Sequence, residues 1–175
     1  VTLLPLLLLL APAAAHADKV LGAELSVVQP FGSGTSGLDS GTGLDARAGY
    51  ELPIPFLLVA VEAVFGVATM NPADQTNDSL LGYRAMAGAR LGWGWLFSPQ
   101  FFAHVGYGRM GSADHVPVRG VALDLGGALD FNALPYLRAG IHAAWNRIQG
   151  NVQAPQGGPS AYNWLTWGVQ ASLVW

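Results

Sequence analysis

The sequence has no cysteine and a single lysine, Lys19, among its 175 residues. The absence of cysteine excludes a lipid-anchored cysteine after a leader and any metal site built from thiolates. Charged residues make up only 11% of the chain, against roughly a quarter in ordinary soluble domains. Because soluble proteins cover themselves largely with Lys and Glu, this chain has little with which to coat a surface in water.

Long hydrophobic runs are also missing, although hydrophobic residues make up 51% of the chain. No internal segment reaches the roughly 18 consecutive apolar residues that a membrane-spanning helix needs. High hydrophobicity in short, alternating segments is typical of a membrane barrel. The length of 175 residues favours one domain, and a net charge of −3 gives no basic surface for nucleic acid, so we expect no nucleic-acid partner.

Residues 1–17 are predicted to be a signal peptide. Leu3 to Leu10, interrupted by Pro5, form a short apolar core, and Ala15-His16-Ala17 has the small-x-small form of a signal-peptidase site. The run lacks Met and a basic start, which indicates a truncated leader or a non-standard start codon. We therefore expect a mature domain of residues 18–175, outside the cytoplasm.

The stretch from Tyr162 to Trp175 alternates with a period of two, which predicts a strand with one apolar face. Seven upstream segments have the same period: Lys19–Val28, Leu44–Leu52, Phe56–Thr69, Leu81–Leu91, Phe101–Met110, Gly120–Asp130 and Leu137–Asn146. The connectors alternate between polar, mostly long segments and short segments that carry Pro or aromatic residues. This alternation predicts an all-β, eight-stranded antiparallel up-and-down transmembrane barrel with its two ends in different solvents.

Composition indicates which face of the barrel points inward. The polar phase is largely Gly, Ala and Ser, which suits the crowded interior of a narrow barrel. A soluble, lipocalin-like ligand-binding barrel, whose exterior should be dense in charge, remains an alternative. Aromatic girdles are expected at both rims. One comprises Tyr50, Phe56, Trp93, Trp95, Phe101, Tyr136 and Trp175, and the other Phe31, Tyr107, Trp145 and Tyr162.

The final strand, which stops on its apolar side with a bare aromatic residue, resembles the closing strand of bacterial outer-membrane β-barrels, here of the small OmpA/OmpX-like class. The resemblance implies an outer-membrane location in a Gram-negative bacterium, contact with outer-membrane lipid and lipopolysaccharide, and a non-enzymatic structural or surface-interaction role with variable outer loops. It also implies a C-terminal signal for the barrel assembly machinery. That signal would comprise Trp167, Val169, Ala171, Leu173 and Trp175.

Charged residues of the inward phase are predicted to form a lumen network. A hairpin centred between Ile54 and Pro55 would set Arg47 opposite Glu62, and Arg90 would reach Glu62 from the next strand. A hairpin centred on Ala133 would set Asp124 opposite His142. We expect Arg47, Glu62, Arg90, Asp124 and His142 to close the lumen so that the barrel is plugged.

An enzyme remains an alternative, because some outer-membrane barrels are lipid A deacylases or acyltransferases. Asp124 and His142 could form a triad with Ser172 or Ser26. No clustered His-x-Ser supports this, so a structural histidine is favoured and no catalytic residue is assigned. No metal-ligand spacing is visible, and the glycines of residues 32–37 are not followed by a helix, so we expect neither metal nor cofactor.

Overall fold

The computed structural model describes residues 18–32, 35, 37–54, 56–74, 78–93, 96–112, 117–134, 136–150 and 160–175. The predicted signal peptide and Trp95 lie outside the described residues. The chain forms the strands β1 (Asp18–Phe31), β2 (Leu38–Asp39), β3 (Gly41–Ile54), β4 (Leu57–Pro72), β5 (Leu80–Trp93), β6 (Phe97–Gly111), β7 (Val118–Leu134), β8 (Leu137–Gly150) and β9 (Ala161–Val174).

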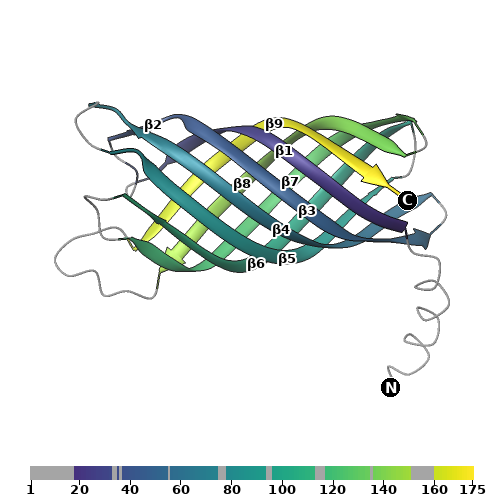
Figure 1. Cartoon of the computed structure of the whole chain (residues 1–175), viewed down its shortest axis with the longest axis horizontal. Coiled ribbons are helices and arrows are strands. Elements are labelled where there is room, and N and C mark those ends of the chain that lie inside the picture. Colours follow the sequence, from purple (N-terminus) through teal and green to yellow (C-terminus); the bar gives the residue numbers. More distant parts are fainter. Residues whose placement is uncertain are drawn as a thin grey trace, which may run out of the picture.

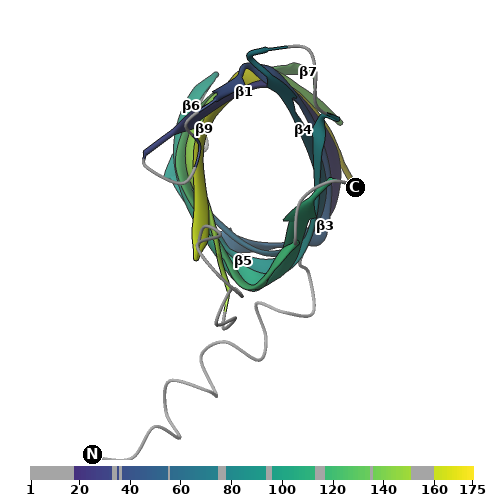
Figure 2. The same ribbon diagram turned by 90° about the vertical axis from the view of Figure 1, so that its left-hand side faces the viewer.

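Eight long strands close into an antiparallel barrel (Figures 1 and 2). Each pairs with its sequence neighbours, β1 pairs with β9, and the same sheet includes the β4–β5 pairing. The junction of β1 with the C-terminus continues to the last residue, where the Lys19 amide donates to the Trp175 carbonyl at 2.7 Å. The predicted eight-stranded antiparallel barrel is therefore confirmed.

One short element was not predicted. Strand β2 lies within a connector that the sequence indicated to be irregular, and it pairs with the end of β4 through Leu38–Pro72 and Asp39–Asn71. The long strands also extend beyond their predicted limits; β6, for example, begins at Phe97 and not at Phe101. Ladder partners such as Phe131, which lies opposite Phe97, stabilise these extensions, and the local pattern of the sequence does not reveal such partners.

The two ends of the barrel differ. We call the end at which β1, β4, β6 and β8 finish the loop end, and the end at which β3, β5, β7 and β9 finish the turn end. In Figure 1 the C-terminus lies at the turn end and β2 at the loop end. Exposed aromatic residues surround the turn end as predicted, namely Tyr50, Phe56, Trp93, Phe101, Tyr136 and Trp175.

Along each strand exposed side chains alternate with buried ones, and the exposed set is the apolar phase predicted from the sequence. On β9, for example, Leu165, Trp167, Val169 and Leu173 point outward, whereas Thr166, Gln170 and Ser172 are buried. Apolar side chains therefore cover the outside, and the polar side chains of the strands point inward. This is the reverse of a soluble calyx, whose apolar face would point inward. No helix within the described ranges is long and apolar enough to cross a bilayer.

The interior changes character along its length. At the loop end it is apolar, whereas the sequence predicted a polar lumen throughout. We call this region the apolar cluster; it comprises Val28, Val64, Ala68, Met70, Leu80, Met86, Met110, Val118, Ala122, Ile148, Tyr162 and Trp164. The placement of Tyr162 in an outer girdle is thus wrong, because Tyr162 has the inward parity of β9 and is 3% exposed.

Candidate functional site: a charged layer inside the barrel

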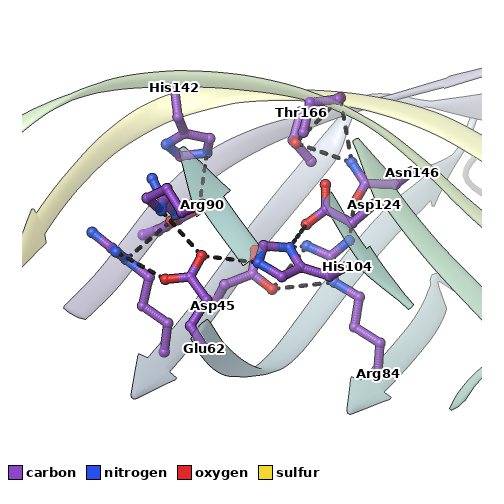
Figure 3. Close-up of polar contacts among 12 residues, drawn as sticks. Asp45, Glu62, Arg84, Arg90, His104, Asp124, His142, Asn146 and Thr166 are labelled. Atoms are coloured by element: carbon purple, nitrogen blue, oxygen red, sulfur yellow. Dashed lines mark hydrogen bonds and ion pairs between the residues drawn. The ribbon is translucent and has the colours of Figure 1, made fainter. Parts of the chain in front are cut away.

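A layer of ionisable side chains crosses the interior below the apolar cluster. Seven consecutive strands of the ring, from β1 and β3 through β8, each contribute one inward residue. This charged layer comprises Glu24, Arg47, Glu62, Arg90, His104, Asp124 and His142, and each is at most 8% exposed. All occupy the inward phase, so the alternation of each strand aims them at the interior. Figure 3 labels five of them, namely Glu62, Arg90, His104, Asp124 and His142.

Glu62 on β4 is the centre of the layer. Its Oε1 lies 3.0 Å from Arg90 Nε and 2.9 Å from His104 Nε2. Its Oε2 accepts a hydrogen bond from Arg47 Nη1 at 3.2 Å. Three cationic or potentially cationic groups therefore surround one buried carboxylate, which satisfies its acceptors and offsets the cost of removing it from water.

Glu24 on β1 joins the same arginines from the other side. Its Oε1 lies 3.4 Å from Arg47 Nε and 3.2 Å from Arg90 Nη2, and its Oε2 lies 3.7 Å from His142 Nε2. Arg90 also donates to Gln100, and its guanidinium stacks over the Phe102 ring. The alternating carboxylates and guanidiniums thus form a continuous network across the barrel.

The hydrogen bonds of His104 define its charge. Its Nδ1 lies 3.1 Å from Asp124 Oδ2, while its Nε2 lies beside Glu62. Ionised carboxylates only accept hydrogen bonds, so both ring nitrogens must carry a proton and the imidazole is cationic. With Arg47 and Arg90 it balances the three carboxylates of the layer. The Nδ1 of His142 has no hydrogen-bond partner among the described residues.

Inward glycines let charged side chains meet across an intervening strand. The register aligns Glu62, Gly88 and His104 in one row, and the imidazole contacts the carboxylate over the glycine. A Cβ on Gly88 would lie 2.7 Å from the Cα and the Cδ2 of His104. Two further rows have the same form: Asp45–Gly66–Arg84 and Asp130–Gly140–Gln170, each with its outer members hydrogen-bonded.

The Arg84–Asp45 pair borders the apolar cluster. Arg84 Nη2 lies 2.8 Å from Oδ1 and 2.7 Å from Oδ2 of Asp45, its Nη1 donates to Asn146, and its guanidinium lies 5.7 Å from the Trp164 ring centroid. Nearer the turn end Asp130 accepts hydrogen bonds from Gln100 and Gln170. Polar contacts therefore extend from mid-barrel to the turn end.

The structure brings the predicted lumen residues into one interior, with partners that differ in part from those expected. Arg90 reaches Glu62 as anticipated. Arg47 also reaches Glu62, but diagonally, because the β3–β4 register places Gly49 opposite Glu62 and Val64 opposite Arg47. The turn is centred one residue later than predicted, and this shifts the pairing by two positions.

The predicted Asp124–His142 pair is wrong. Asp124 lies opposite Asn146 on β8 and opposite His104 on β6, while His142 lies opposite Ala128 and faces Glu24. The β7–β8 hairpin is centred near residue 135 and not on Ala133, which moves the partner of Asp124 four positions along β8, from His142 to Asn146. Sequence reasoning missed Glu24, Asp45, Arg84 and His104 as partners, although inward glycines beside charged positions were visible signals.

The charged layer consists of buried ionisable groups that are paired with one another. Ser26 and Ser172 are buried, and within the described ranges neither makes a hydrogen bond to His104 or His142, so the triad considered above is not assembled there. Among the same residues no group of three or more His, Asp or Glu could hold a metal ion.

Solved structures with the same architecture include Ail, the attachment invasion locus protein of Yersinia pestis (TM-score 0.55, 13% identity, 91% of this chain and 99% of that chain covered). Neisserial surface protein A matches with a TM-score of 0.53 and 12% identity over 90% of this chain and 95% of that chain. The chain has the fold of the small outer-membrane β-barrels. The outer-membrane enzyme PagL matches as well, with a TM-score of 0.51 and 10% identity over 87% of this chain and 97% of that chain. Identities this low show a shared fold alone. No protein-family model and no curated protein matches the sequence.

Proposed function

We propose that this protein is an integral outer-membrane barrel with a closed interior, without enzymatic activity, whose role is structural or depends on surface interactions at the loop end. The observation that carries the proposal is the inverted polarity of the barrel. Apolar side chains cover the outside, and the ionisable groups of the charged layer are buried in ion pairs inside. An apolar exterior of this kind is stable in contact with lipid chains and not in contact with water.

Two barriers in series support a closed lumen. The apolar cluster fills the loop-end half, where Met70, Met110 and Trp164 are at most 1% exposed. Below it Arg90, at 2% exposure, bridges Glu24 and Glu62. An eight-stranded barrel is just wide enough for its side chains to fill, so we propose a plug and not a pore.

The positions of the histidines favour a non-enzymatic role. A lipid-modifying enzyme must present its catalytic groups to lipid, whereas His104 and His142 point into the lumen and are at most 5% exposed. His115 lies outside the described residues. Lipid A mass spectra from cells with the wild-type protein or H142A should therefore be identical, and a mass change that depends on His142 would restore the enzyme hypothesis.

Outer-membrane insertion is tested by fractionation and by gel mobility. The protein should appear in the outer-membrane fraction, require detergent for extraction, and migrate differently on a denaturing gel with and without boiling. In planar bilayers the purified barrel should show no steady, porin-sized conductance. A detergent-independent soluble protein would overturn the membrane assignment, and stable conductance would overturn the plug. The C-terminal assembly signal remains a prediction, although its residues on β9 do face outward.

A further inference from the structure

Three arginines outside the lumen have no ion-pair partner among the described residues: Arg109 on β6, Arg119 on β7 and Arg147 on β8. All the other arginines are paired. Arg47, Arg84 and Arg90 bind carboxylates inside the barrel, and Arg138 binds Glu51 at the turn end. The unpaired arginines are therefore not scattered: they lie on three adjacent strands, all towards the loop end.

Arg109 and Arg119 lie directly opposite each other on the β6–β7 ladder, and both are exposed. Directly opposed residues have Cβ atoms about 5 Å apart, and like charges at this separation destabilise the sheet. An anion bound between the two guanidiniums would remove this repulsion. Arg147 adds a third donor group lower on the same face, and its Nε is buried without a hydrogen-bond partner.

Aromatic neighbours indicate the depth of this site. Tyr107 precedes Arg109 by two residues on the outward face of β6, and Trp145 precedes Arg147 in the same way on β8. Tyr83 lies directly opposite Arg109 and is also exposed. Tyr and Trp concentrate at the boundary between hydrocarbon and head groups. Arg109 and Arg147 each lie two residues closer to the loop end than these aromatic residues, and are thus at the level of the head groups.

We propose that Arg109, Arg119 and Arg147 bind the phosphate of a lipid head group in the leaflet at the loop end. Guanidiniums donate paired hydrogen bonds that match phosphate oxygens, which makes arginine better suited to this task than lysine. The side chains emerge on the same outward face as Leu123 and Val121, so the ligand is a lipid lying against the wall and not a soluble anion above the loops. The inference rests on the proposed membrane location and adds a partner to it.

The test uses the full-length folded protein in detergent micelles, with phosphorylated lipid A as the probe. Binding is measured by native mass spectrometry for the wild type, R109Q, R119Q and R109Q/R119Q. The loss of one charge-assisted interaction should weaken binding about tenfold, and the double variant should bind more weakly still. K19Q, which removes a cation at the turn end, is the matched control and should bind like the wild type.

Dephosphorylated lipid A and inorganic phosphate distinguish the sources of the anion. Dephosphorylated lipid A should bind weakly and equally to the wild type and the double variant, and inorganic phosphate should compete poorly. Equal binding of lipid A to the wild type and R109Q/R119Q would overturn the inference, as would an equal loss in K19Q or full competition by inorganic phosphate. The gel shift of unboiled protein is scored separately: a barrel that inserts but fails these tests refutes the lipid site alone, whereas a chain that does not insert refutes both proposals.

Discussion

His104 and Asp124 lie directly opposite each other on β6 and β7, with the imidazole Nδ1 3.1 Å from the carboxylate Oδ2. Both are buried, so their interaction should be strongly coupled. We expect the variants H104Q and D124N, alone and combined, to give a coupling energy of about 0.5–3 kcal/mol. Urea unfolding of the barrel in lipid vesicles measures the free energies of unfolding.

The control cycle pairs Asp124 with His142, the partners that the sequence suggested. His142 faces Glu24 instead, and the two residues share no contact in the layer. Their substitutions should therefore add to within about 0.5 kcal/mol. Equal coupling energies in the two cycles would show that the charges of the layer interact collectively. The His104–Asp124 contact would then contribute no more than other pairs.

Glu62→Gln should destabilise the barrel strongly. The carboxylate offsets the charge of Arg47, Arg90 and His104, and neutralising it leaves buried cations without compensation. We expect a loss of about 3–5 kcal/mol in the free energy of unfolding. Glu51→Gln is the matched control, because the Arg138–Glu51 pair lies at the rim and is more exposed. Loss of this ion pair should lower the free energy of unfolding by about 1 kcal/mol or less. Equal losses would mean that the layer does not depend on its charges.

The fold was largely predictable, because strand period and side-chain parity are local properties. Each outward apolar residue of β9 could be assigned from its odd number alone. The same parity rule placed Glu62, Arg90 and His142 inside. For Tyr162, aromatic character favours an outer girdle and parity favours the interior, and the structure follows parity.

Pairing was less predictable, because it depends on turn geometry, which a short connector barely specifies. A one-residue change in the β3–β4 turn moved every partner by two positions, yet Arg47 still reached Glu62 because its side chain is long enough for the diagonal. On β7 and β8 the pairing differs from the predicted one by more positions, and the short side chain of Asp124 cannot span the distance to His142. Contacts across three strands, such as Arg84 with Asp45 over Gly66, require the register of two ladders at once.

Ala87 lies at the middle of β5 and points outward, where we propose that it meets lipid. Ala87→Arg should destabilise the barrel by about 2–4 kcal/mol, because a charge at mid-membrane depth loses its hydration. Ala139, an outward residue near the turn end of β8, provides the control, and Ala139→Arg should cost about 0–1 kcal/mol. Vesicle unfolding measures both variants; similar small costs would contradict lipid contact at Ala87.

Gly88→Ala tests whether inward glycines are required for the contact between Glu62 and His104. The new methyl group would overlap the backbone of β6 as well as the imidazole, so the strands would have to separate. Overpacking of this kind costs about 1–3 kcal/mol. Gly127→Ala is the control, since its Cβ would meet no atom closer than 3.3 Å. A loss of unfolding free energy in G88A but not in G127A would support the need for glycine between Glu62 and His104. Equal stabilities of the two variants would show that this glycine is not required.

Trp164 and Arg90 are the largest of the fully buried side chains, and they occupy the two successive barriers of the lumen. Because the barriers act in series, removing one should leave the other to block ions. We expect W164A and R90A each to show no ion conductance in planar bilayers. The double variant W164A/R90A should show discrete conductance steps. The gel shift of unboiled protein must show that each variant is folded. Conductance from W164A alone would mean that the charged layer admits ions, and a silent, folded double variant would place the seal elsewhere in the barrel.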